Sequence, residues 1–200
     1  VKVGNVSENL CLSRIPGDKR SKICAPEDTA GKGSDISMLV AHAFREMAKT
    51  SDIAIQNGGG VRTDIAKGDL TMGDAYKLLP FANTLVEMDM TGAEIKAVLE
   101  EALDYALQPD GSTGAYPYAA GLRWHVDAGK PAGERLSKIE FKGRNESSWS
   151  ALDMNKSYRL VTNNYIAAGR DGYLTFKTVK NDGRYTCLLY TSPSPRDLTT

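Results

Sequence analysis

Asp52-Ile-Ala-Ile-Gln-Asn-Gly-Gly-Gly-Val-Arg62 is the most informative stretch of this chain. Its first residues form a short apolar run, which predicts a buried strand. The three glycines place no side chain against a neighbour, and they can adopt positive φ and turn successive N–H groups toward one point. Arg62 adds a planar, permanently charged group suited to phosphate or carboxylate. The pattern predicts a cradle for an anion or nucleotide, and the alternative is a tight turn with a surface arginine.

This glycine turn matches neither of the two common phosphate loops. No Gly-Lys-Ser/Thr follows it, which excludes a P-loop. The G-x-G-x-x-G spacing of dinucleotide-binding folds is missing as well. The ligand class must therefore be inferred from other parts of the chain.

Helices and strands interleave around this stretch without a strict βαβ repeat. Residues 34–48 carry apolar side chains at helical spacing behind an N-cap candidate, Ser34. Residues 92–107 do the same behind Thr91, with Glu94 completing a capping box. Other expected elements are a short helix at 74–79 and strands near 10–14, 69–71, 83–90, 122–126, 136–141 and 158–163, with loops over most of 1–34 and over 108–119. We therefore predict an α+β fold, a mixed β-sheet with packed helices.

The bulk composition excludes some classes of partner. The chain has 200 residues, 41% of them apolar, and its 25 Lys and Arg balance its 25 Asp and Glu. A general nucleic-acid or membrane-surface binder needs a basic excess, so neither is expected. No apolar run approaches membrane-spanning length, and we expect no membrane-spanning segment.

The two ends of the chain suggest a fragment. It begins with Val1 and carries no signal peptide, so we expect an upstream part to be missing. After Tyr185 the residues run through proline and hydroxyl side chains without periodicity, and Leu188-Leu-Tyr-Thr-Ser-Pro-Ser-Pro-Arg-Asp197 resembles translated library-adapter sequence. We expect residues 1–185 to form the domain and residues 186–200 to be a non-native or disordered tail, in which Cys187 carries no functional weight.

Cys11 and Cys24 flank a loop rich in Pro, Gly, Lys and Arg, which is a poor setting for buried free thiols. A disulfide closing this loop would stabilise the fold by roughly 3 kcal/mol on the chain-entropy model. It would also imply an oxidising compartment. Two unpaired surface thiols are the alternative. Zinc is not expected, because the spacing is not C-x-x-C and no second ligand pair lies near.

No catalytic group is evident in the sequence. The chain has only His42 and His125, and neither stands in a metal-binding context. A two-metal hydrolase needs several His and carboxylate ligands around ions roughly 3.5–4 Å apart. A G-x-S-x-G elbow and a credible Cys–His pair are missing as well. We expect both histidines to be structural or surface residues, no metal site here and, for an enzyme, a reactive centre elsewhere.

Two further loops carry groups suited to a planar base and a sugar. In Pro80-Phe-Ala-Asn83, Phe81 can project outward for stacking, and Asn83 offers a donor and an acceptor. In Asn163-Asn-Tyr-Ile-Ala-Ala-Gly-Arg-Asp-Gly-Tyr173, Tyr165 could face Phe81 across a slot, and Asp171 could accept hydrogen bonds from ribose. The alternatives are a Phe81 that fills the core and a Tyr165 that packs inward. The three loops together indicate a binding site better than any one of them.

Five motifs in order resemble those of a known family. They are Gln56-Asn-Gly-Gly-Gly-Val-Arg62, Leu79-Pro-Phe-Ala-Asn83, Asp89-Met-Thr-Gly92, Gly114-Ala-Tyr-Pro117 and Asn164-Tyr-Ile-Ala-Ala-Gly-Arg-Asp-Gly172. Together they resemble the C-terminal domain of the secreted 5′-nucleotidases, the group that includes UDP-sugar hydrolase. The resemblance covers roughly residues 10–185.

The resemblance implies a two-domain enzyme that dephosphorylates nucleotides in the periplasm or outside the cell. In that family an N-terminal metallophosphoesterase domain holds two divalent metal ions and a His–Asp catalytic pair. The C-terminal domain binds the nucleoside and swings between open and closed positions. On this resemblance the present chain binds base and ribose, holds no cofactor itself, and needs the missing domain in cis for catalysis.

The same resemblance implies roles for the nucleoside-binding side chains. Phe81 and Tyr165 would sandwich the base, although the family often has Phe at the second position. Asn83 would contact the base edge, and Asp171 would contact the ribose.

The resemblance assigns the phosphate-contacting residues less completely. Arg62 would reach toward phosphate, and Asn57 would help shape that corner. Another phosphate-contacting arginine usually lies shortly before the first helix, where Arg14 and Arg20 are both candidates.

Two other classes of function stay open. The chain could be a non-catalytic module that holds a nucleotide, a sugar or a cell-surface partner. It could also be a structural domain without a ligand. Asp-x-His and Asn-His-Glu motifs encoded upstream of Val1 would favour the enzyme, whereas a buried and widely separated Phe81 and Tyr165 would favour the structural domain.

Overall fold

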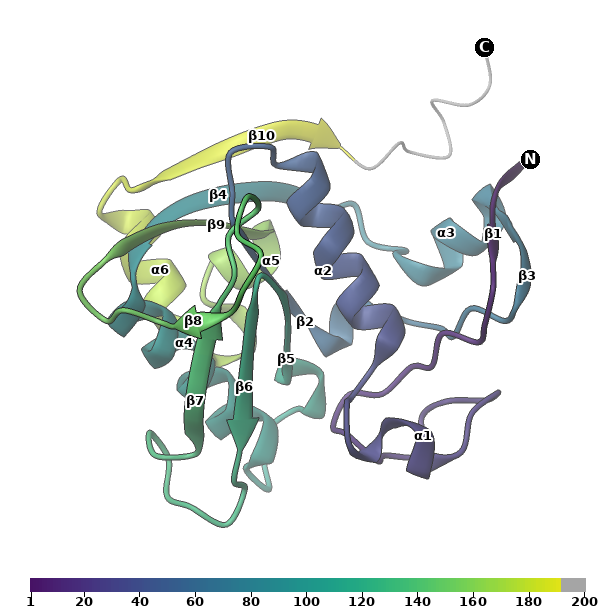
Figure 1. The fold of residues 1–200 in the computed structure, drawn as a ribbon, viewed down its shortest axis with the longest axis horizontal. Helices are drawn as coiled ribbons and strands as arrows, with labels where there is room; N and C mark the ends of the chain where they lie inside the picture. Colours follow the sequence, from purple (N-terminus) through teal and green to yellow (C-terminus); the bar gives the residue numbers. More distant parts are fainter. Residues whose placement is uncertain (192–200) are drawn as a thin grey trace.

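A five-stranded mixed sheet forms the centre of the molecule (Figure 1). The computed structural model describes residues 1–191. The strand order is β10-β4-β9-β2-β5, with β2 and β9 parallel and the other neighbours antiparallel. The strands are β2 (Ile53–Asn57), β4 (Thr84–Thr91), β5 (Pro117–Ala120), β9 (Ser157–Asn163) and β10 (Tyr185–Thr191). The α+β fold with a mixed sheet and packed helices is confirmed.

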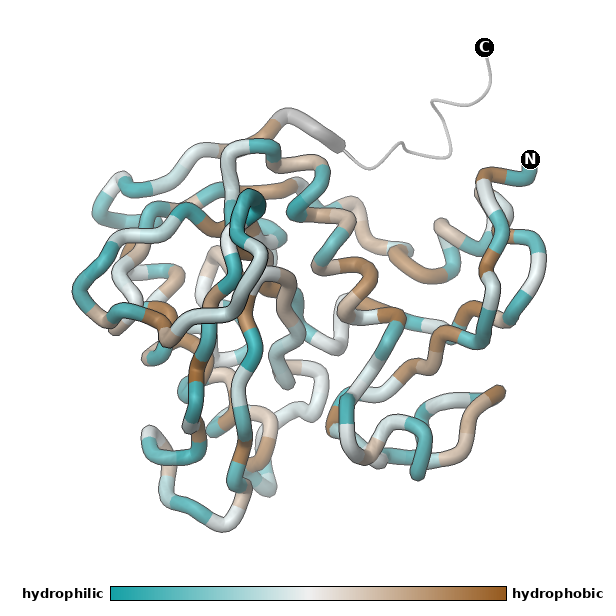
Figure 2. The backbone as a smooth tube through the Cα atoms, in the orientation of Figure 1, coloured by the Kyte–Doolittle hydropathy of each residue, from teal (hydrophilic) through white to brown (hydrophobic). Residues whose placement is uncertain are grey.

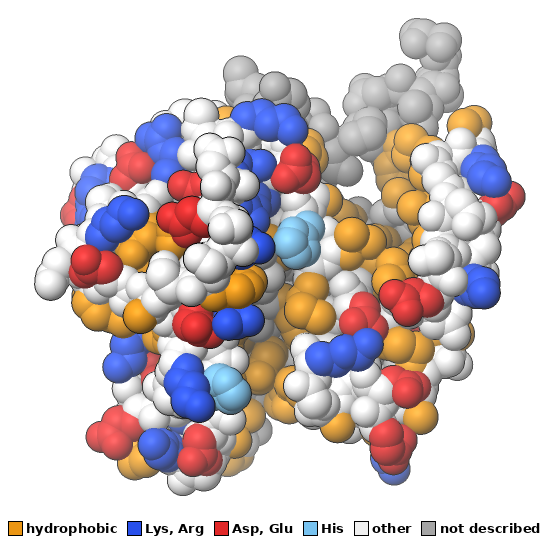
Figure 3. All heavy atoms as spheres, in the orientation of Figure 1, with side chains coloured by type: hydrophobic (Ala, Val, Ile, Leu, Met, Phe, Trp, Pro, Cys, Tyr) orange, Lys and Arg blue, Asp and Glu red, His pale blue; other side chains and the backbone are white. Residues whose placement is uncertain are grey.

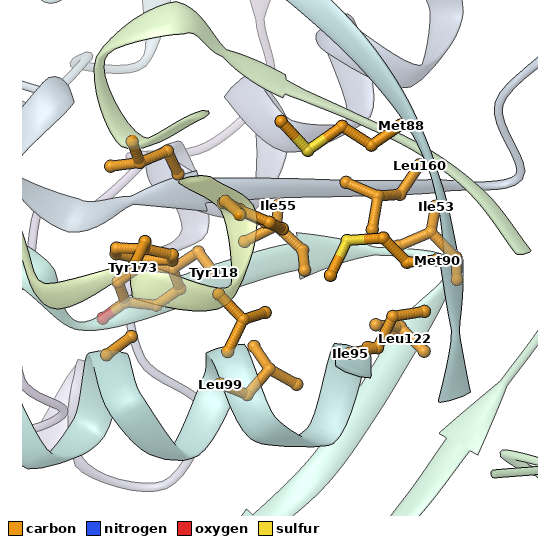
Figure 4. Packing of buried hydrophobic residues seen from close by; sticks show 14 of the residues in the cluster. Ile53, Ile55, Met88, Met90, Ile95, Leu99, Tyr118, Leu122, Leu160 and Tyr173 are labelled. Atoms are coloured by element: carbon orange, nitrogen blue, oxygen red, sulfur yellow. The ribbon is translucent and has the colours of Figure 1, made fainter. Parts of the chain in front are cut away.

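Helices cover both faces of this sheet. They are α2 (Asp35–Met47) on one face and α4 (Gly92–Leu107) and α6 (Leu174–Asn181) on the other. In β2, Ile53 and Ile55 lie in the cluster beneath α4, whereas the intervening Ala54 packs with Ala41 of α2. Figure 4 shows side chains of α4, including Leu99, pointing toward these isoleucines. A strand buried on both faces explains why its sequence is an apolar run without alternation.

Smaller elements complete the fold around the sheet. A three-stranded sheet contains β6 (Leu122–Val126), β7 (Leu136–Phe141) and β8 (Ser150–Ala151), and a two-stranded sheet contains β1 (Lys2–Val6) and β3 (Gly68–Thr71). The short helices are α1 (Pro26–Ala30), α3 (Met72–Leu78) and α5 (Asn164–Ala167), and the 3₁₀ turns are η1 (Gly58–Gly60), η2 (Thr113–Ala115) and η3 (Arg170–Gly172). The connection between β6 and β7 is mostly hydrophilic or neutral (Figure 2).

The two predicted helix caps form as expected. The Ser34 hydroxyl accepts a hydrogen bond from the backbone N–H of Ser37 at 3.1 Å. Thr91 and Glu94 form a reciprocal capping box, with N···O distances of 3.2 and 2.8 Å. These bonds satisfy N–H groups that a helix start otherwise leaves unpaired, and they place both helix starts where the sequence predicts them.

Residues 186–200 were expected to be a non-native or disordered tail. The expectation of disorder is wrong for the part of this segment that belongs to β10 (Tyr185–Thr191). This strand pairs antiparallel with β4, with Leu188 opposite Leu85. Leu188 also packs against the cluster beneath α2. The open edge of β4 supplies hydrogen bonds that no periodicity in the sequence reveals. Residues 192–200 lie outside the described residues, and the non-native origin of the segment stays a prediction.

The N-terminal segment also differs from expectation. The strand expected near residues 10–14 reduces to one bridge, between Leu10 and Ile65. Instead β1 lies earlier and α1 later, in a part of the chain expected to be loop. β5 likewise begins inside the expected 108–119 loop. β1 is largely exposed, so it lacks the alternation from which a strand is predicted.

The molecular surface shows no preference for one sign of charge on the face seen in Figure 3, where acidic and basic side chains are interspersed. This face is hollowed between the β6–β8 sheet and the α1–α2 side (Figure 3), where a cavity of about 500 Å³ is lined by residues such as Met38 and Trp124. Within residues 1–191, no helix has the length and apolar character needed to cross a bilayer.

Candidate functional site

One cavity of about 270 Å³ is lined by all six side chains that the sequence singles out for a ligand. Strand direction explains the convergence. The parallel strands β2 and β9 end at the same edge of the sheet, where the antiparallel strands β4 and β5 begin. The loops at this edge therefore meet, although they are far apart in the chain. The lining residues are Arg14, Asn57, Gly59, Gly60, Arg62, Phe81, Asn83, Ser112, Gly114, Tyr165 and Asp171.

The glycine turn forms η1 and supplies one wall of the cavity. None of its three glycines has positive φ, which corrects the expectation that they use left-handed backbone. They are required by close packing instead. A Cβ on Gly59 would lie 3.0 Å from the Gly114 Cα, so only glycine allows η1 and η2 to touch. This contact holds the cavity wall together from two distant segments.

The two aromatic rings are half exposed rather than buried. Phe81 has 47% of its surface exposed and Tyr165 has 44%. Both line the same cavity. A Phe81 that fills the core, a Tyr165 that packs inward and a wide separation of the two rings are thereby excluded. The Arg62 guanidinium carbon lies 5.7 Å from the centre of the Phe81 ring, which is within cation–π range.

Asp171 stands in a strained loop and carries the only carboxylate among the lining residues. Its backbone is left-handed, with φ 55°, between Gly169 and Gly172, which also have positive φ. Its carboxylate accepts hydrogen bonds from Asn57 Nδ2 at 2.9 Å and from the Tyr165 hydroxyl at 3.1 Å. Strained backbone of this kind persists only where surrounding contacts over-determine it. These contacts present the Asp171 carboxylate to the cavity in a defined orientation.

Asn57 lines the same cavity as Arg62, and its amide nitrogen donates a hydrogen bond to Asp171. Its expected part in shaping the phosphate corner stays a prediction. Its amide oxygen accepts a hydrogen bond from Asn163 Nδ2 at 3.0 Å. Both polar atoms of the Asn57 side chain are therefore hydrogen-bonded to residues of the segment 163–173. Asn57 is a positioning residue for the Asp171 carboxylate.

Asn163 is a site residue that the sequence reasoning missed. It is 1% exposed and caps α5, accepting hydrogen bonds from the backbone N–H groups of Tyr165 and Ile166. Its amide nitrogen donates to Gln56 as well as to Asn57. The available signal was an asparagine between a strand and a short helix, which is the residue type preferred at an N-cap.

Arg14 is the second arginine of the cavity, and Arg20 is not among the lining residues. The Arg14 backbone N–H donates to Asp18 at 3.0 Å, and its carbonyl accepts from the Tyr118 hydroxyl at 3.0 Å. Cys11 and Cys24 form a disulfide that closes the loop carrying this residue. The loop is therefore held by a covalent link and by hydrogen bonds.

The two guanidinium groups oppose one another electrostatically. Burial lowers the pKa of Arg14, and the charges of Arg20 and Arg62 lower it further, whereas the carboxylates of Asp18 and Asp171 act in the opposite direction. Neither Arg14 nor Arg62 forms a salt bridge with a carboxylate in the described part of the chain. An anion between the two arginines would relieve this repulsion.

The residues described by the structure include no group of three or more His, Cys, Asp or Glu placed to hold a metal ion. His42 and His125 are exposed on α2 and β6, and neither lines the cavity. The cavity can thus bind a ligand through rings, guanidinium groups and one carboxylate.

Comparison with known proteins shows the family. The model of the 5′-nucleotidase C-terminal domain matches residues 14–178. This chain belongs to the 5′-nucleotidase C-terminal domain family. It is 42% identical over 174 residues to the NAD 5′-nucleotidase of Haemophilus influenzae, covering 86% of this chain and 29% of the relative.

Solved structures of this family agree with the fold. The structure of Haemophilus influenzae NAD nucleotidase matches with a TM-score of 0.78 and 39% identity, over 93% of this chain and 31% of that one. The 5′-nucleotidase precursor from Thermus thermophilus matches with a TM-score of 0.73 and 33% identity, over 88% and 32%. The chain thus spans less than a third of these 5′-nucleotidases.

Proposed function

We propose that this chain is the substrate-binding domain of a 5′-nucleotidase and that the 270 Å³ cavity binds the nucleoside part of the substrate. The observation that carries this proposal is the meeting of Phe81 and Tyr165, both half exposed, at one cavity of a size near that of small-molecule sites, roughly 300–1,000 Å³. Exposed rings are unfavourable in water, and a planar base between them would bury both. Asn83 then contacts the base edge, and Asp171 accepts hydrogen bonds from the ribose.

The phosphate lies at the arginine end of the same cavity in this proposal. Arg14 and Arg62 supply two planar, charged donors without a carboxylate ion-pair partner among the described residues. Each arginine–phosphate contact contributes about 1.5–3 kcal/mol as a charge-assisted hydrogen bond. Together with stacking, these contacts suit a nucleoside monophosphate better than a free sugar.

Catalysis requires a second, metallophosphoesterase domain in cis, in the part of the relatives that this chain does not match. When bound there, two divalent metal ions polarise the phosphate and activate the attacking water. The residues of the present cavity bind and orient the nucleoside and hold its phosphate. We expect no hydrolysis of nucleotides by this fragment alone.

We propose a periplasmic or extracellular location for the protein. The Cys11–Cys24 disulfide supports it, because disulfides persist in oxidising compartments and are rare in the cytosol.

Titration of AMP into the 200-residue chain, followed by NMR, tests the proposed function. We expect weak but saturable binding, which Phe81→Ala reduces by about 1–3 kcal/mol, or roughly 5- to 150-fold, because one stacking surface is lost. The matched control is Tyr185→Ala, which removes an equally exposed ring on β10. Absence of AMP binding by the wild-type chain would reject the proposal, and equal losses in the two variants would reject the stacking role.

A further inference from the structure

The Tyr165 hydroxyl closes a ring of hydrogen bonds at the cavity. It donates to Asp171 Oδ1 at 3.1 Å, while Asn57 Nδ2 donates to Asp171 Oδ2 at 2.9 Å. Asn163 bonds to Asn57 through its amide nitrogen and to the backbone N–H of Tyr165 through its amide oxygen. The ring therefore runs through four side chains and returns to the residue where it begins. It joins an aromatic wall of the cavity to the carboxylate beside it.

The ring leaves a particular set of acceptor positions on the carboxylate. An ionised carboxylate has about two lone-pair positions on each oxygen. Tyr165 occupies one position on Oδ1, and Asn57 occupies one on Oδ2. One acceptor position is then left on each oxygen of Asp171. Two hydroxyl groups on adjacent carbons present two O–H donors side by side, which is the arrangement that fills both positions.

The hydrogen bonds from Asn57 and Tyr165 also keep the plane of the Asp171 carboxylate from rotating. Asn57 is 3% exposed and fixed by Asn163, so its contact with Oδ2 is rigid. Tyr165 holds the other oxygen from the cavity side. Burial raises the pKa of this phenol, and the charge of Asp171 raises it further. The hydroxyl is therefore a donor at neutral pH. Without the phenol hydroxyl, the carboxylate would be held at one oxygen only. A restrained acceptor binds more tightly because less freedom is lost when the ligand binds.

We propose that the Tyr165 hydroxyl is a specificity determinant that makes the site selective for ribonucleosides over 2′-deoxyribonucleosides, by orienting Asp171 for a vicinal diol. The proposal rests on nucleoside binding at this cavity. Its new element is the hydroxyl, which acts through Asp171 and is separate from the stacking ring that carries it. Phenylalanine at this position would stack equally well but would leave the carboxylate free to turn.

The test measures the affinities of adenosine, 2′-deoxyadenosine and adenine for the 200-residue chain and for its Tyr165→Phe variant. Adenine reports stacking alone. We expect the wild-type chain to prefer adenosine over 2′-deoxyadenosine by about tenfold, since a hydrogen bond to a charged group is lost with the 2′-hydroxyl. In Tyr165→Phe the preference should fall to about threefold or less, while the affinity for adenine stays within about twofold.

Tyr105→Phe is the matched control, because it makes the same chemical change beside the same loop. Tyr105 lies against Gly172, is 37% exposed and is not among the residues that line the cavity. This variant should keep the wild-type preference. A Tyr165→Phe variant that also keeps it would overturn the proposal while leaving nucleoside binding intact. If none of the three compounds binds the wild-type chain, the proposed function and this inference fall together.

Discussion

Arg14 and Arg62 are charged groups of one sign that line one cavity, and each lacks a carboxylate ion-pair partner in the described residues. The charge of Arg62 contributes to the lowered pKa of Arg14. Such an arrangement is unfavourable in the free protein and becomes favourable when an anion joins the two groups. In the proposed function, the two arginines hold the phosphate, and the rings of Phe81 and Tyr165 hold the nucleoside.

This separation gives a prediction for single substitutions. We expect Arg14→Ala and Arg62→Ala each to weaken AMP binding by about 1.5–3 kcal/mol, because a charge-assisted contact is lost. Adenosine, which has no phosphate, should bind with its affinity changed by less than about twofold. Arg20→Ala is the control, since Arg20 was an equal candidate in the sequence but does not line the cavity. Equal losses for AMP and adenosine in Arg14→Ala and Arg62→Ala would contradict the phosphate assignment.

The sequence predicted which residues line the cavity better than it predicted the hydrogen bonds between them. Phe81, Asn83 and Asp171 were predictable because each stands in a loop after or before an apolar strand, where polar and aromatic side chains are unusual. The bond between Asn57 and Asp171 was not predictable, because the two residues meet only after β2 and β9 pair. The same holds for Asn163, whose role depends on what surrounds it. The sequence pattern predicts which side chains a segment presents, and tertiary packing decides which of these side chains contact one another.

At the scale of elements, capping residues and buried strands were predictable, and edge strands and short exposed helices were not. α2 and α4 begin where their cap residues predict, because local hydrogen bonds determine a helix start. β1 and β10 lie at sheet edges and owe their structure to a neighbouring strand. α6 was missed because its apolar face is small, with Phe176 and Val179 as its buried residues. Elements stabilised mainly by partners leave a weak pattern in their own sequence.

The start of α4 also gives a prediction about pH. Hydrogen bonds from Arg184, and further ones from Thr91, lower the pKa of Glu94 from 4.5 to about 2. A carboxyl whose pKa is depressed by folding stabilises the folded state fully above its unfolded pKa, and this contribution is lost as the pH falls from about 4.5 toward 2. We therefore expect the free energy of unfolding to decline across this window, and to decline less in Glu94→Gln.

Urea unfolding at several pH values measures this effect. Glu94→Gln should be less stable than the wild-type chain at neutral pH, and the difference should shrink as the pH approaches 2. Arg184→Gln is the partner control, because it removes the main cause of the shift and should flatten the same window. An unchanged pH dependence in Glu94→Gln would show that this ion pair does not couple to folding.

At the scale of the whole molecule, the fold brings the side chains that line the cavity to one edge of a sheet, and the described residues include no cluster placed to hold a metal ion. The chain spans less than a third of the relatives it matches. Its cavity collects lining residues from several separate segments, so the site exists only in the folded domain. The proposed function assigns nucleoside binding to this domain and attack on the phosphate to a second domain.

A crystal structure of this chain with AMP tests the central claim most directly. We expect the adenine between the Phe81 and Tyr165 rings, the ribose hydroxyls on Asp171, and the phosphate within hydrogen-bond distance of Arg14 and Arg62. AMP bound outside this cavity, or bound within it with the phosphate turned away from both arginines, would contradict the proposed nucleotide site.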